Sequence, residues 1–187
     1  MPARGPARCR NASFSRCEGR FASQPARVLE TLPHVEVFSL SELLQDVGQK
    51  FAPLAAEKQV RLSVDADPEG LFVRADIGMI ERVIANLIDN AIRHTPASGA
   101  ISLEAVSTPA GIEVRVADTG VGIATEYLPG LFGRDSPLRQ TAGRTGGGLG
   151  LRIAERILAL HGTRMAVASE SGHGTTFRFA LPAAQPG

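Results

Sequence analysis

The order of apolar periodicities along the chain is the strongest constraint on its fold. Apolar residues recur at helical spacing over 38–59, 77–93 and 148–162, and short segments of alternating polarity lie between these stretches. The alternating segments come in pairs, at 60–67 with 71–76, at 100–106 with 112–118, and at 164–170 with 175–182. Tight turns join the second and third pairs, so we predict antiparallel neighbours there.

Paired strands between helices favour a mixed, largely antiparallel sheet over a doubly wound parallel sheet. The helices are then expected on one face of that sheet. A length of 187 residues is enough for one such domain with a sizeable core. We therefore predict an α/β fold that is a two-layer sandwich.

Four local signals refine the predicted helices. Ser39 or Ser41 is a plausible N-cap for the first helix, and Pro53 is expected to kink or interrupt it. Asp76 is expected to cap the second helix, and the third should stop at Gly162.

The composition argues against several classes of partner. The net charge is only +1, aromatic residues are 5% of the chain and tryptophan is absent, so we expect no nucleic-acid partner. Cys9 and Cys17 both lie near the N-terminus, which suggests neither a disulfide framework nor a metal site. No apolar run approaches the roughly 18 residues that span a bilayer, so we expect no direct membrane contact.

The two ends of the chain differ from its centre. Residues 1–27 have no apolar periodicity and are predicted to be a poorly ordered tail, and residues 183–187 a second tail. The first tail has one acid, Glu18, and is rich in arginine (Arg4, Arg8, Arg10, Arg16, Arg20, Arg27). An organelle transit peptide has this composition, but an arbitrary N-terminus in an arginine-rich proteome explains it more simply.

Two asparagines, Asn86 and Asn90, lie one turn apart inside the predicted helix 77–93. Asparagine is a poor helix former, because its side chain competes for backbone hydrogen bonds. On a helical projection the pair stands beside Arg93 at one border of the apolar face. Either the asparagines solvate that edge, or they present neutral oxygens that can ligate a hard cation.

Glycines lie at the ends of two other predicted elements. The strand 112–118 ends in Asp118, and Gly120 and Gly122 follow it. A carboxylate there suits a hydrogen bond to a ligand amine while the backbone approaches a flat ring, although an ordinary turn explains the same residues. The stretch 144–157 places glycines at the start of a helix, where free N–H groups and the helix dipole favour phosphate.

The order of these stretches is more specific than any one of them. NLIDNAIRHTP resembles the N box of the catalytic, ATP-binding domain of bacterial sensor histidine kinases. DTGVGI, GGGLGL and GHGTTF resemble the three glycine boxes of that domain, in the same order. The resemblance covers about 39–182 and extends to the superfamily of gyrase, Hsp90, MutL and histidine kinases. It implies a Bergerat-type ATP-binding fold, with residues 39–182 as the catalytic domain.

The resemblance implies that the cofactors are ATP and Mg²⁺. Asn90 would ligate Mg²⁺, which bridges the phosphates, and Asn86 would lie beside it. Arg93 matches a position usually held by lysine and would contact phosphate. His94 matches a position that is commonly aromatic.

The resemblance also assigns the adenine and phosphate contacts. Asp118 would accept a hydrogen bond from the adenine amine, and Thr175 would support adenine through a bridging water. Gly120 and Gly122 would let the backbone approach the purine. The remaining contacts, backbone groups around the phosphates, would come from the second glycine box (Gly146, Gly148, Leu149, Gly150).

The segment at about 123–146 corresponds to the ATP lid of this family and departs from the usual pattern. Its LFGRDSPLR contains only Phe132 of the two expected phenylalanines, and residues are missing before Arg134. Arg134 is a candidate lid arginine that would reach the γ-phosphate, and the alternative is a solvated loop arginine. We assign no other catalytic residue.

A histidine kinase phosphorylates a histidine on a helical dimerisation domain, from which a response regulator receiver domain takes the phosphate. None of the four histidines (His34, His94, His161, His173) has the expected sequence context. Residues 28–38 resemble the end of a dimerisation helix and its linker, so the chain resembles a fragment that starts late. We therefore predict a cytoplasmic protein-histidine kinase domain that acts on a histidine of another chain.

Other interpretations remain open. One is a hydrolytic ATPase of the gyrase or MutL type. Such an enzyme normally has glutamate at the position of Asn86, so the asparagine argues against it. A mitochondrial protein kinase of the same superfamily fits the arginine-rich start but needs a long helical domain, and an anti-sigma serine kinase fits 28–38 less well. The main alternative, which the altered lid supports, is a nucleotide-binding or degenerate docking module without kinase activity, which binds ATP weakly or not at all and acts by docking.

Overall fold

The computed structural model describes residues 32–67, 71–132 and 147–185. The predicted helices and strands are present, together with one unpredicted strand and one short 3-10 helix. In chain order the elements are β1 (Glu36–Ser39), α1 (Leu40–Glu57), β2 (Arg61–Ala66), β3 (Phe72–Ala75), α2 (Ile77–His94), β4 (Ala100–Thr108), β5 (Gly111–Asp118), η1 (Thr125–Gly130), α4 (Gly147–Leu160), β6 (Ala166–Glu170) and β7 (Gly174–Leu181).

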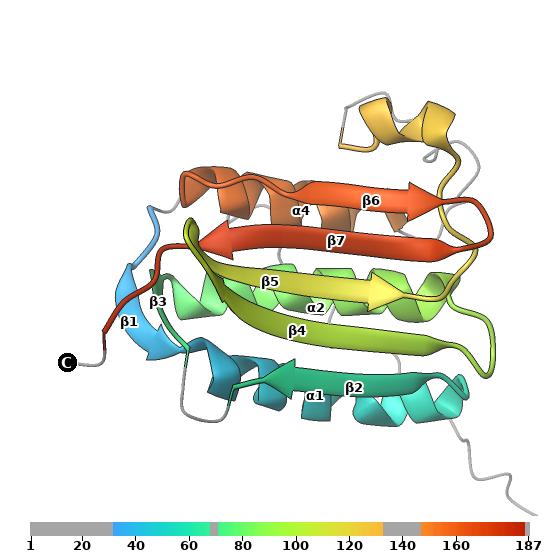
Figure 1. The fold of residues 1–187 in the computed structure, drawn as a ribbon, viewed down its shortest axis with the longest axis horizontal. Coiled ribbons are helices and arrows are strands. Elements are labelled where there is room, and N and C mark those ends of the chain that lie inside the picture. Colours follow the sequence, from blue (N-terminus) through green and yellow to red (C-terminus); the bar gives the residue numbers. More distant parts are fainter. Residues whose placement is uncertain (1–31, 68–70, 133–146, 186–187) are drawn as a thin grey trace, which may run out of the picture.

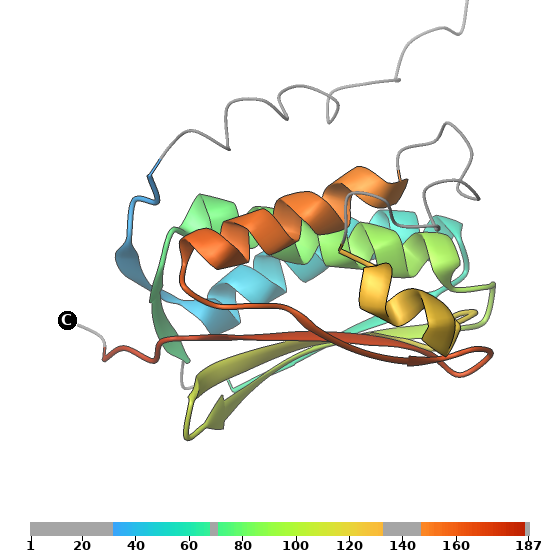
Figure 2. The same ribbon diagram turned by 90° about the horizontal axis from the view of Figure 1, so that it is seen from above.

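The main sheet has five strands in the order β2-β4-β5-β7-β6 (Figure 1). The β4–β5, β5–β7 and β6–β7 pairs are antiparallel, and only β2 and β4 are parallel. The long helices of the described residues, α1, α2 and α4, all lie on one face of this sheet (Figure 2). The structure therefore confirms the predicted two-layer α/β sandwich with a mixed, largely antiparallel sheet.

A smaller sheet at one end of the domain contains the unpredicted strand. β1 pairs antiparallel with β3, and Val73 of β3 bridges to Ala183 after β7. Residues 36–38 of the segment interpreted as a linker thus belong to β1, whereas 28–31 lie outside the described residues. Four residues are too few for alternation to be recognised, which is why the sequence did not predict β1. The linker interpretation of 28–38 and the division into domain and tails stay predictions.

The first helix begins at the first of its two predicted caps. The Ser39 hydroxyl accepts the Glu42 N–H at 3.2 Å. Ser41 is buried instead, where its hydroxyl donates to the carbonyl of Asp67. The helix continues past Pro53 to Glu57, so the expected interruption at Pro53 does not occur. Buried residues precede and follow the proline in the helix, so packing on the core compensates for one missing backbone hydrogen bond.

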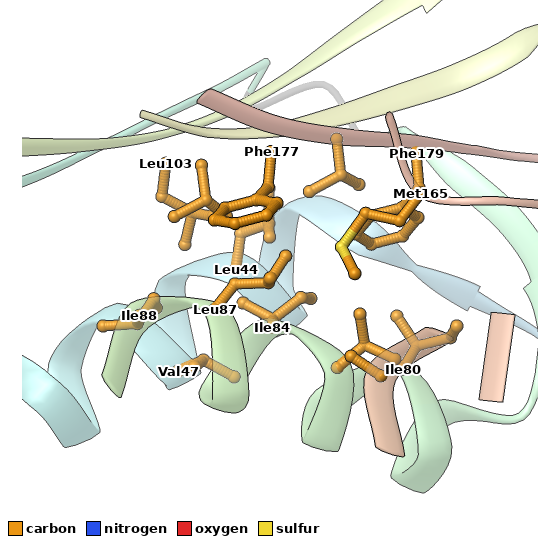
Figure 3. Packing of buried hydrophobic residues seen from close by; sticks show 14 of the residues in the cluster. Leu44, Val47, Ile80, Ile84, Leu87, Ile88, Leu103, Met165, Phe177 and Phe179 are labelled. Carbon is orange, nitrogen blue, oxygen red and sulfur yellow. The ribbon is translucent and has the colours of Figure 1, made fainter. Parts of the chain in front are cut away.

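The helix α2 lies between α1 and α4, above the sheet. Its N-cap is Asp76, whose carboxylate accepts the Met79 N–H at 2.9 Å, as predicted. The predicted apolar face is buried along its whole length (Ile80, Val83, Ile84, Leu87, Ile88, Ala91). Figure 3 shows this face packed toward Leu103 and Phe177 of the sheet. This contact is the centre of the core.

No helix among the described residues is long and apolar enough to cross a membrane. The apolar faces are used for packing on the sheet instead.

Truncation of the core side chain Leu87 tests the role of α2. Leu87 is fully buried, so Leu87→Ala should lower the free energy of unfolding by about 2–5 kcal/mol through lost burial and a residual cavity. The control is Leu54→Ala on α1, because Leu54 is 37% exposed and should lose well under about 2 kcal/mol. Urea denaturation measures both values. Equal losses at the two positions would contradict the packing described for α2.

Candidate functional site

One end of the sheet brings several predicted site residues together. β5 ends and β7 begins there, and the register places Asp118 opposite Thr175. Ser169 of β6 is the next residue in the same row, because it is paired with Thr175 on the other side. Alternation along β5 directs Asp118 to the same face as Val114 and Val116, which is the face under the helices.

The Asp118 carboxylate is buried, with 9% of the residue exposed. Its Oδ1 accepts the N–H groups of Gly120 at 2.8 Å and Thr175 at 3.3 Å. Burial raises the pKa of the Asp118 carboxyl, and the two N–H groups and the nearby His94 offset part of this rise. Among the described residues no hydrogen bond to Oδ2 is found, so this oxygen can accept from a ligand.

The glycines after Asp118 have a steric reason that is independent of any ligand. A Cβ on Gly120 would lie 2.5 Å from the His94 carbonyl oxygen and 2.7 Å from the Asp118 carboxylate. Gly122 has a φ of +67°, and a Cβ there would collide with the Glu170 backbone carbonyl. The backbone therefore passes closely between the end of α2 and the end of β6. No larger residue fits at either position without displacing its neighbours.

The two asparagines of α2 lie at the border of its buried face, as predicted. Both are half-buried. The Asn86 Nδ2 is fully buried and has no hydrogen-bond partner among the described residues. A buried donor without a partner is unfavourable by about 1–3 kcal/mol. The Asn86 side chain thus fits a site in which another molecule completes its hydrogen bonding.

The first turn of α4 lies against this asparagine. A Cβ on Gly150 would approach the Asn86 Oδ1 to 3.2 Å, so the two elements are in close contact. The helix begins at Gly147, which puts Gly148 in its first turn, and Leu149 is 51% exposed. A helix start has free N–H groups and a partial positive charge, which favour anions. Gly146 lies outside the described residues.

Two further candidate residues, Arg93 and His94, are the last two residues of α2. Arg93 forms an ion pair with Asp89 one turn earlier, at 2.8 Å between Nη2 and Oδ2. Both side chains are more than 40% exposed, so this pair contributes little to stability. His94 is also exposed, and its carbonyl accepts the Val121 N–H at 3.2 Å. A phosphate contact by Arg93 would compete with Asp89.

Ser169 belongs to the row of Asp118 and Thr175 and was not predicted from the sequence. Its hydroxyl oxygen lies 2.8 Å from the Ile123 nitrogen, 2.8 Å from the Gly174 carbonyl oxygen and 2.9 Å from the Thr175 hydroxyl. Ser169 thus connects the start of the predicted lid segment to the row that contains Asp118. The available signal was a polar residue at an inward position of an alternating strand, two residues after Val167.

Most of the predicted lid is not part of the described chain. Arg134 lies outside the described residues, so its assignment stays a prediction. The described part contains η1, which contacts β6, and then Leu131 and Phe132, which pack on the core.

Comparison with known proteins identifies the family. Residues 75–185 match the family described as Histidine kinase-, DNA gyrase B-, and HSP90-like ATPase. Sensor protein FixL from Bradyrhizobium diazoefficiens is 39% identical over 151 residues, which are 79% of this chain and 29% of FixL. The chain thus spans less than a third of the length of that curated relative.

Solved structures of sensor kinases have the same fold. The catalytic domain of histidine kinase ThkA superposes with a TM-score of 0.70 at 29% identity, covering 79% of this chain and 95% of that domain. Full-length ShkA, solved in complex with AMPPNP, gives a TM-score of 0.72 at 28% identity and covers 82% of this chain and 32% of ShkA. The chain belongs to the Histidine kinase-, DNA gyrase B-, and HSP90-like ATPase family, and within it to the catalytic domains of sensor histidine kinases.

Proposed function

We propose that this domain binds Mg²⁺-ATP between α2, α4 and the end of the sheet, and transfers the γ-phosphate to a histidine of another chain. One observation carries the proposal: the buried, partnerless Asn86 Nδ2 lies where the start of α4 meets α2. The row of Asp118 and Thr175 lies at the same end of the sheet (Figure 1). A ligand with an amine at one end and anionic oxygens at the other suits both features.

Asp118 and Thr175 form the proposed adenine end. The Asp118 Oδ2 would accept from the 6-amino group of adenine, while Oδ1 stays bonded to two backbone N–H groups. Discrimination is expected to be strong, because a purine without this amine leaves a buried carboxylate oxygen unpaired. Gly120 and Gly122 hold the backbone beside this end of the site without a side chain.

Asn86, Asn90 and the first turn of α4 form the proposed phosphate end. Within the part of the chain that the structure describes, no group of three His, Cys, Asp or Glu residues could hold a metal. By its match to the N box of the family, the Asn90 amide oxygen would be the protein ligand, with the remaining positions filled by phosphate and water oxygens, which Mg²⁺ accepts readily. When bound, Mg²⁺ neutralises charge on the phosphate oxygens. Backbone N–H groups of Gly148, Leu149 and Gly150 would bind the same phosphates.

The chemical step needs little from the side chains of this domain. An imidazole nitrogen of the acceptor histidine forms a bond to the γ-phosphorus, and the bond from phosphorus to the oxygen of ADP breaks. The domain orients the γ-phosphate and stabilises charge, which accounts for most catalysis in phosphoryl transfer. We propose a helical dimerisation domain as the source of that histidine and a receiver domain as the next acceptor. The cytoplasm, where ATP is abundant, is the proposed location.

Loss of the amide oxygen of Asn90 tests the metal site. Asn90→Ala should weaken ATP binding roughly 10- to 100-fold in the presence of Mg²⁺, because one metal ligand is lost. Titration calorimetry measures the affinity, and the same titration with EDTA is the control. Without Mg²⁺ the variant and the wild type should bind alike. An equal deficit in both buffers would contradict the role of Asn90 as a metal ligand.

Replacement of Asp118 by its neutral isostere tests the adenine end. Asp118→Asn should lower the affinity for ATP roughly 10- to 100-fold, because an N–H donor takes the place of one carboxylate oxygen.

The stability of the folded Asp118→Asn variant should change in the opposite direction to its ATP affinity and increase. Folding raises the Asp118 pKa above its ordinary value of 3.8, so folding favours the protonated acid, and this contribution is lost as the pH rises through the folded pKa.

The variant Asp118→Asn cannot ionise, so its stability relative to wild type should be greater at about pH 7 than at about pH 4. Urea denaturation at both pH values measures the difference. An unchanged difference, or one of the opposite sign, would contradict the burial of an ionised carboxylate at this position.

Transfer of labelled phosphate tests the kinase proposal itself. The domain, Mg²⁺ and γ-labelled ATP should label a purified dimerisation domain that carries an acceptor histidine, and the label should be acid-labile and alkali-stable. Asp118→Asn should reduce the transfer at ATP concentrations that only just saturate the wild type. If the folded wild type shows no detectable binding of ATP at millimolar concentrations, the result favours the docking module instead.

A further inference from the structure

We propose that Ser169 is a positioning residue that sets the donor direction of the Thr175 hydroxyl, and thereby contributes to selection of a 6-amino purine. The inference rests on the proposed function, because it concerns the adenine end of that site. Ser169 of β6 is paired with Thr175 of β7, which is in turn paired with Asp118. The Ser169 hydroxyl makes three hydrogen bonds.

The hydrogen atoms around Ser169 can be assigned by counting donors and acceptors. A hydroxyl has one proton to donate and two lone pairs that accept. The Ile123 backbone N–H is a donor, so Ser169 accepts there at 2.8 Å. The Gly174 carbonyl oxygen only accepts, so Ser169 donates its single proton there, also at 2.8 Å.

One contact of Ser169 is left, to the Thr175 Oγ1 at 2.9 Å. The proton of Ser169 is already used, so Thr175 must donate in this bond. The reverse direction would leave the Ser169 oxygen and the Gly174 carbonyl oxygen as two acceptors 2.8 Å apart, which is repulsive. The assignment with Thr175 as donor is the one that satisfies all three contacts of Ser169.

The direction of this bond determines what Thr175 offers to a ligand. With its proton directed to Ser169, the Thr175 oxygen can only accept. Thr175 lies beside Asp118 in the cross-strand register, and both are buried. The adenine end of the site therefore presents two neighbouring acceptors, the Thr175 oxygen and the Asp118 Oδ2, either directly or through water.

Two acceptors suit adenine better than a 6-oxo purine. Adenine carries a 6-amino group, which donates, whereas guanine has a 6-oxygen, which accepts. A 6-oxygen placed beside two acceptors has no donor to bind. If Ser169 loses its hydroxyl, the Thr175 proton is released and can turn toward the site, where it would donate to a 6-oxygen.

The test compares ATP with inosine triphosphate, which has a 6-oxygen but no 2-amino group. Titration calorimetry gives the ratio of the two affinities for wild type and for Ser169→Ala. We expect the preference for ATP to fall about 3- to 10-fold in Ser169→Ala, through tighter inosine triphosphate binding relative to ATP. Ser169→Thr retains the hydroxyl and should keep the wild-type ratio, and so should the exposed control Ser171→Ala.

Equal weakening of both nucleotides in Ser169→Ala would overturn the inference, because it would show a purely structural role. An unchanged ratio would overturn it as well. If Ser169→Ala does not fold, Ser169→Cys supplies the measurement, since a thiol keeps the shape but hydrogen-bonds weakly, and the same fall in preference is expected. Failure of the folded wild type to bind ATP would overturn the proposed function together with this inference, whereas wild-type binding with an unchanged ratio overturns the inference alone.

Discussion

Burial of the apolar face of α2 is the interaction on which the rest of the structure depends. This helix contacts α1 on one side, α4 on the other and the sheet below, and its core residues are fully buried. A helix that is held on three sides has little freedom to rotate or slide. Its polar border is therefore placed accurately, and Asn86 meets the first turn of α4 for that reason.

The same end of the domain holds two features that are unfavourable for stability. Asp118 is a buried carboxylate with a raised pKa, and Asn86 has a buried amide nitrogen without a partner. Unfavourable polar groups that gather in one place are typical of binding sites, because a ligand supplies the missing interactions. The apolar core around α2 offsets the cost, so the site is held by a fold that is stabilised elsewhere.

Periodicity and turn residues predicted most of the fold because they are local signals. Asp76 and the apolar face of α2 could be identified from residues within a few positions of one another. β1 could not, because it is short and the strand that it pairs with, β3, lies far along the chain. Pro53 was expected to kink or interrupt α1. The helix is not interrupted there, because packing on the core holds it together on both sides of the proline.

The candidate site shows the same difference between what local patterns predict and what contacts between distant segments decide. The sequence by itself singled out the candidate site residues, namely the asparagines of α2, Asp118 and the glycines, because the residue types and their order are specific. Only the tertiary structure decided which of them meet. Strand register joins Asp118, Thr175 and Ser169 in one row, and helix packing brings Gly150 onto Asn86. Register and packing depend on contacts between distant segments, and the local pattern of a chain contains no record of those contacts.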